Sequence, residues 1–125
     1  MEDRACRRHP HEACGLLLGR RSGSRTAVVD VVESRNLVTT RAHDRFELDP
    51  ADHLAAEELA RELGLDVVGI WHSHPDHPAV PSEADRVHAW ESWAYVIVSV
   101  VDGVARELRA WRLAGERFVE EEVQP

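Results

Sequence analysis

The sequence predicts a single α+β domain, α/β-like in the order of its elements, with one mixed β-sheet flanked by helices. Two observations support this fold class. Apolar runs of strand length are separated by turn signals, and one well-formed amphipathic helix lies between two of those runs. The 125 residues are enough for one hydrophobic core and too few for two, so we expect residues 1–125 to form one domain.

The first strands are expected to form a hairpin. Cys14–Arg20 is a short apolar run, Thr26–Ser34 is rich in valine, and Ser22-Gly23-Ser24 lies between them. Residues 1–11 are polar and lack a helical stripe of useful length, so at most a stub of helix is expected around Asp3 to Arg8. The hairpin is therefore the first element predicted to build the sheet.

The predicted helix follows Asp49 and ends at Gly64. Asp49 is a favourable N-cap, Pro50 suits the first helical position, and Gly64 provides the stop. The apolar residues of this segment recur at helical spacing and predict one face against the sheet: Ala56, Leu59, Ala60 and Leu63.

Val67–His74 is apolar on both faces, which predicts a central strand covered on both sides. Strict alternation would place Val68 and Ile70 on the histidine side and Trp71 on the other. Three further segments are predicted to be antiparallel strands at the end of the chain: Ala94–Val101, 104–113 and Arg117–Val123. Asp102-Gly103 forms the turn between the first two, and the last strand lies at an edge of the sheet.

Composition and charge restrict the possible partners. With 43% hydrophobic and 30% charged residues, the chain reads as an ordinary globular protein, and its formal charge of −8 argues against nucleic acid. No apolar run approaches the roughly 18 residues of a membrane span, and the start lacks an apolar signal-peptide core. We therefore expect a cytoplasmic protein without membrane or nucleic-acid partners, in which Cys14 is a small buried side chain.

His72 and His74 end the apolar run and are spaced i, i+2, which puts both imidazoles on one face of a strand. Asp85 follows after a proline-rich loop, and this loop is long enough for the chain to turn back and bring the Asp85 carboxylate to the two histidines. Two imidazoles and one carboxylate leave the fourth tetrahedral position open, as in catalytic zinc sites. A second interpretation stays open, because Ser82-x-x-Asp85 also has the spacing of a helix capping box.

These residues also resemble a family signature. His72, His74, Pro75, Ser82 and Asp85 are similar to the motif of the JAMM (MPN+) metallopeptidases. The block Pro10–Gly19 resembles the segment that carries the catalytic glutamate of that family, here Glu12. The resemblance runs from about Pro10 to Val101, and it implies a curved mixed sheet similar to that of the zinc-dependent cytidine deaminases.

The resemblance implies a mechanism and a partner. His72, His74 and Asp85 would hold one zinc ion, Glu12 would accept a proton from the attacking water, and Ser82 would donate a hydrogen bond to the oxyanion. The chain looks like the small prokaryotic members, which implies cleavage after the C-terminal Gly-Gly of a ubiquitin-like or sulfur-carrier protein. The alternative is an inactive MPN scaffold, although such relatives usually lose a ligand. A deaminase is disfavoured because the sequence has no Cys-x-x-Cys pair.

Overall fold

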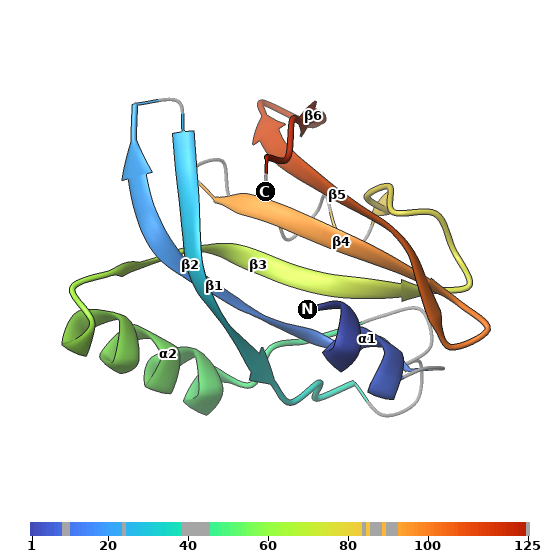
Figure 1. Cartoon of the computed structure of the whole chain (residues 1–125), viewed down its shortest axis with the longest axis horizontal. Coiled ribbons are helices and arrows are strands. Elements are labelled where there is room, and N and C mark those ends of the chain that lie inside the picture. Colours follow the sequence, from blue (N-terminus) through green and yellow to red (C-terminus); the bar gives the residue numbers. More distant parts are fainter. Residues whose placement is uncertain are drawn as a thin grey trace.

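The computed structural model describes residues 1–8, 11–23, 25–38, 46–83, 85, 89 and 93–124. Six strands form one sheet in the order β2-β1-β3-β4-β5-β6. Figure 1 shows this sheet as strongly twisted, with the β1–β2 hairpin extending away from both helices. The elements are α1 (Glu2–Arg8), β1 (Cys14–Ser22), β2 (Arg25–Ser34), α2 (Pro50–Glu62), β3 (Asp66–Pro75), β4 (Ala94–Val101), β5 (Val104–Ala114) and β6 (Arg117–Glu121).

The sheet is mixed, as the sequence predicts. Neighbouring strands pair antiparallel except β3 and β4, which are parallel. Strand β3 lies between β1 and β4, and its residues from Val68 to Pro75 are buried. The expectation of a central strand covered on both faces is therefore confirmed, and the histidines lie where this strand leaves the core.

The two helices cover opposite faces of the sheet. Ala56 and Ala60 of α2 belong to the core cluster that contains Ile97 of β4. Ala5 of α1 packs instead with Val98, the next residue along β4. Because consecutive strand residues point to opposite faces, the sheet has helices on both sides, as predicted.

The short helix α1 packs on the sheet through Ala5, with Met1 and Cys6 partly buried beside it. Ala5 is fully buried, and the acidic residues Glu2 and Asp3 in the first turn are exposed. The stub expected from the sequence therefore exists as a helix of seven residues.

One detail of β3 differs from the alternation expected from the sequence. Leu17 pairs with Gly69 and Leu18 with Val67, so Val68 has no partner on β1 at this point. Val68 consequently packs with Trp71, while Ile70 lies in the cluster on the other face. The prediction that Val68 shares a face with Ile70 was wrong, because a β-bulge inserts one residue and shifts the alternation.

The expectation that Cys14 is a small buried side chain is met. Cys6 and Cys14 are both free, and Cys14 is fully buried. Among the described residues, no helix has the length and apolar character needed to span a bilayer.

Candidate metal centre

The two histidines converge at the carboxyl end of β3. The Nε2 atoms of His72 and His74 lie 3.1 Å apart, and the residues are 1% and 7% exposed. Phe46, from the segment before α2, stacks on the His72 ring with 4.5 Å between ring centroids. The i, i+2 spacing therefore produces the shared direction that the sequence predicts, in an environment largely closed to solvent.

Asp85 completes a triangle with the two imidazoles. Its Oδ2 lies 3.3 Å from Nε2 of His72 and 3.2 Å from Nε2 of His74. Zinc with bonds of about 2.0–2.1 Å to nitrogen and oxygen has tetrahedral ligand atoms roughly 3.3 Å apart. The three donor atoms are thus spaced as ligands of one small divalent ion would be, so the residues present fit a zinc site.

Glu12 lies beside this triangle. It is 3% exposed, and its Oε1 is 4.0 Å from Nε2 of His74. The ligand atoms of Glu12, His72 and His74 all lie within 4.8 Å of one another, so this buried group is also able to hold a metal ion. Since 4.0 Å exceeds a tetrahedral ligand spacing of roughly 3.3 Å, Asp85 fits the third ligand position better than Glu12 does.

The backbone around Glu12 is held from two sides. Ser73, between the histidines, accepts a hydrogen bond from Ala13 N–H at 2.7 Å, and its own N–H donates to Ala13 O at 2.9 Å. Asn36 Nδ2 donates to Glu12 O at 3.1 Å. Ser73 and Asn36 were not among the residues that the sequence singles out, and the one available signal was a polar Ser73 inside an otherwise apolar strand.

Ser82 and Asp85 cap one another. Ser82 Oγ accepts from Asp85 N–H at 3.1 Å, and Ser82 N–H donates to Asp85 Oδ2 at 2.8 Å. The capping interpretation therefore describes real contacts, and Asp85 faces the histidines at the same time. Glu83 and Asp85 have helical conformation, and residues 84, 86–88 and 90–92 lie outside the described part of the chain.

Hydrogen bonding fixes the tautomer of His74. Its Nδ1 lies 2.8 Å from the carbonyl oxygen of Pro78, which can only accept, so Nδ1 carries the proton. Nε2 is then the ring nitrogen directed at His72 and Asp85. For His72, Nδ1 has no hydrogen-bond partner among the described residues.

The pKa values of the three groups of the triangle are shifted in different directions. Burial lowers the pKa of His72 and outweighs the attraction of Asp85, so this imidazole is neutral near pH 7. Burial also opposes the charged form of His74, but hydrogen bonds to Asp85 and Pro78 and the charge of Glu12 raise its pKa overall. Burial likewise opposes ionisation of Asp85. Its interaction with His72 and the hydrogen bonds from both histidines and Ser82 nevertheless hold the pKa of Asp85 well below the usual range, so it is a carboxylate.

The remaining nearby histidines lie elsewhere. His11 and His77 are exposed, and among the described residues neither is part of the buried group of possible metal ligands. His9, also close in sequence, lies outside the described residues.

Comparison with known proteins places this arrangement in a family. Residues 1–114 match the prokaryotic homologs of the JAB domain. The chain belongs to the JAMM/MPN family. A desampylase from Haloferax volcanii is 36% identical over 112 residues, which are 89% of this chain and 76% of that protein. The CysO-cysteine peptidase of Mycobacterium tuberculosis is 33% identical over 123 residues, covering 95% of this chain and 80% of the relative.

One further relative and two solved structures agree with this assignment. A probable TtuB-protein conjugate cleaving protease from Thermus thermophilus is 36% identical over 78% of this JAMM/MPN chain and 62% of its own length. A protein from Desulfitobacterium hafniense superposes with a TM-score of 0.82 at 34% identity, covering 95% of this chain and 81% of the other. A JAB1/MPN domain protein from Archaeoglobus fulgidus, at 20% identity and a TM-score of 0.55 over 98% and 83% of the chains, supports the fold alone.

Proposed function

We propose that this protein is a zinc-dependent metallopeptidase that hydrolyses the amide or isopeptide bond after the C-terminal Gly-Gly of a ubiquitin-like, sulfur-carrier type of protein. The observation that carries the proposal is the buried triangle of His72, His74 and Asp85 with Glu12 beside it. The relatives named as peptidases and conjugate-cleaving proteases support the class of reaction.

His72, His74 and Asp85 are the residues that would hold the ion. When bound, zinc would supply Lewis-acid polarisation of the substrate carbonyl and acidify a water molecule. Two imidazole nitrogens and one carboxylate form a donor set typical of zinc, and they leave room for further ligands. The tautomer of His74 imposed by Pro78 O keeps Nε2 available for this role.

Glu12 is suited to move the proton. Its carboxylate lies outside the triangle but within 4.0 Å of His74, where it can accept a proton from the attacking water. The same carboxyl group then delivers that proton to the departing nitrogen. Its burial, at 3% exposure, keeps bulk water away from the transfer.

Ser82 is suited to stabilise the oxyanion. Its Oγ accepts from Asp85 N–H, and a hydroxyl that accepts one hydrogen bond still has its own proton to donate. Removal of one such donor typically costs about 2.7–4 kcal/mol of transition-state stabilisation. The cap therefore orients the hydroxyl without using up its donor.

The substrate class is the step that depends most on the relatives. The names of two relatives describe a peptidase for CysO-cysteine and a probable protease that cleaves TtuB-protein conjugates, and a third is named desampylase. From these names we infer that the substrate is a conjugate of a small carrier protein. An extended Gly-Gly tail could pair with a sheet edge through its backbone and so reach the site.

The test uses purified, zinc-loaded protein and a sulfur-carrier domain extended past its Gly-Gly end. We expect mass spectrometry to detect the carrier trimmed to Gly-Gly, and Glu12→Gln to retain zinc but lose trimming. Glu58→Gln, which changes an exposed carboxylate on α2, serves as the matched control and should trim normally. Zinc binding without any trimming would refute the peptidase and favour the inactive scaffold.

A further inference from the structure

The loop between His74 and Ser82 is fastened to the β4–β5 hairpin. At its start, Asp76 N–H donates to Val100 O at 2.6 Å, and Asp76 Oδ1 accepts from Asp102 N–H at 3.1 Å. Ser99 Oγ donates to His77 O at 2.5 Å. The segment that leads from one proposed ligand toward another is therefore a fixed part of the structure.

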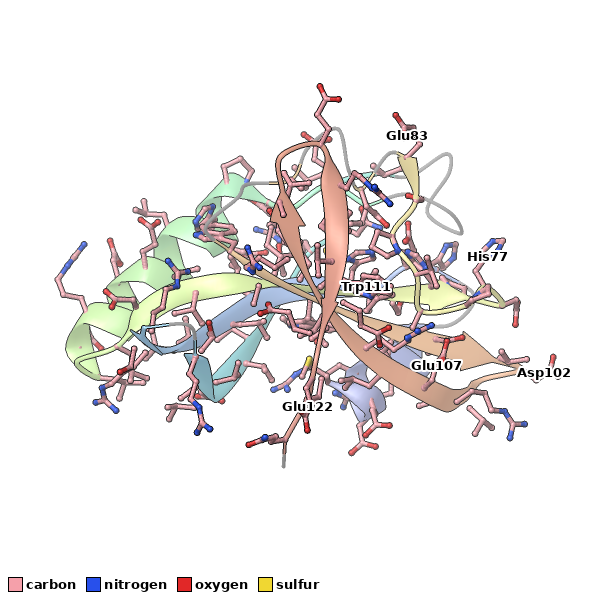
Figure 2. The ribbon with its side chains drawn as sticks, turned by 90° about the horizontal axis from the view of Figure 1, so that it is seen from above. His77, Glu83, Asp102, Glu107, Trp111 and Glu122 are labelled. Carbon is pink, nitrogen blue, oxygen red and sulfur yellow. The ribbon has the colours of Figure 1, made fainter. Side chains whose placement is uncertain are left out.

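Ala79, in the middle of this loop, is held by two side chains of β5. Its N–H donates to Glu107 Oε1 at 2.9 Å, and its carbonyl oxygen accepts from Trp111 Nε1 at 3.0 Å. Glu107 and Trp111 are four residues apart on one strand, so they point to the same face. Figure 2 shows them along β5, with His77 and Glu83 labelled on the neighbouring segment. Ala79 itself is fully buried, so neither of its polar backbone groups can rely on water instead.

The contact with Glu107 continues to His74 through one peptide group. The N–H of Ala79 and the carbonyl of Pro78 belong to the same planar unit, in which a hydrogen bond at one end strengthens the other. Pro78 O accepts from His74 Nδ1 at 2.8 Å. The order of contacts is thus the Glu107 carboxylate, the Pro78–Ala79 peptide, and His74, whose Nε2 faces the metal site.

We propose that Glu107 is a positioning residue for the metal ligand His74 and acts through the Pro78–Ala79 peptide group, with Trp111 holding the next carbonyl. A metal-bound histidine ordinarily donates its second N–H to a carboxylate or a carbonyl, which orients the ring and raises its basicity. Here both acceptors act in series: the carbonyl contacts the imidazole, and the carboxylate fixes and polarises that carbonyl. The inference rests on the proposed zinc site and adds residues that lie 33 and 37 positions beyond His74 in the sequence.

The test measures zinc affinity by chelator competition. Glu107→Ala is expected to weaken zinc binding about tenfold, the lower end of the usual effect of such supporting groups. Glu107→Gln keeps an acceptor oxygen and should stay within about threefold of wild type, because only the charge is lost. Trp111→Phe, which removes the indole N–H and keeps a ring, should also weaken binding, and its effect should not add to that of Glu107→Ala because both act on Ala79.

Two controls separate positioning from general effects. Glu120→Ala removes an exposed carboxylate that pairs with Arg109 on β5 and should leave zinc affinity unchanged. Hydrogen exchange of the Ala79 amide should accelerate in Glu107→Ala and stay slow in Glu107→Gln, with or without zinc. Wild-type zinc affinity in Glu107→Ala, or equal weakening in Glu120→Ala, would overturn the proposal. Neither measurement involves cleavage, so a failure of the peptidase assay alone would leave this inference intact.

Discussion

Asn36 links Glu12 to the segment that covers His72. Its Nδ2 donates to Glu12 O at 3.1 Å, while its Oδ1 accepts from Val38 N–H at 3.0 Å and from Glu47 N–H at 2.9 Å. Phe46, next to Glu47, stacks on His72. Asn36→Asp is the informative change, because it keeps the acceptor oxygen and replaces the donor to Glu12 O by a carboxylate oxygen.

The expected size of the effect follows from that one contact. Losing a hydrogen bond at a buried carbonyl costs about 1–3 kcal/mol, and an added carboxylate facing Glu12 O makes the geometry worse. If misplacement of the Glu12 carboxylate raises the activation free energy by about 1.4 kcal/mol, kcat falls about tenfold. KM should change little, because the backbone of Glu12 does not bind the substrate in the proposed mechanism.

The assay is steady-state cleavage of the extended carrier protein, together with zinc stoichiometry and thermal unfolding. Asn36→Asp should keep its zinc and lose kcat. Ser34→Ala is the matched control, since it removes the bond from Asp49 N–H to Ser34 Oγ in the same region without touching Glu12. We expect a lower Tm but a normal kcat for that variant. A wild-type kcat in Asn36→Asp would show that this contact does not position Glu12.

Three other predictions concern the ligands, the ion and the sheet. His74→Ala should lower the zinc content of the purified protein, and unchanged stoichiometry would mean that His74 is not a ligand. Zinc at about 100 times its Kd should stabilise the fold by about 2.7 kcal/mol, so chelation should lower Tm by about 10 °C in calorimetry, and a constant Tm would contradict a native-state site. Gly15→Ala would place a Cβ 2.0 Å from Val32 O and 2.3 Å from Trp71 Nε1, two atoms that are hydrogen bonded at 3.0 Å. Gly15→Ala should therefore lower the free energy of unfolding by about 1–3 kcal/mol, measured by urea denaturation, and a wild-type urea midpoint would refute that packing argument.

Local sequence signals predicted most of the fold. The hairpin, the capped helix and the buried central strand each depend on residues that are close in sequence, and each is present: β1–β2, α2 and β3. The N-cap at Asp49 is an example, since its side chain accepts from Ala51 N–H at 2.8 Å. The bulge at Val68 was not predictable in the same way, because it is defined by the register between β1 and β3, which lie about fifty residues apart in the sequence.

The same distinction applies to the site. His72 and His74 could be placed together because strand alternation is a local rule, and Asp85 was a candidate because the chain could turn back within eleven residues. The groups that support them are different: Asn36 reaches Glu12 across 24 positions, and Glu107 reaches Ala79 across 28. No spacing rule relates such residues, because their proximity is created by the order of strands in the sheet. Strands β3 and β5 are separated by β4 in the sheet. Glu107 of β5 can act on His74 of β3 because the loop that follows β3 reaches β5, where Ala79 is hydrogen bonded to Glu107 and Trp111. If this is correct, the strength of metal binding is set as much by the β4–β5 hairpin as by the ligand motif.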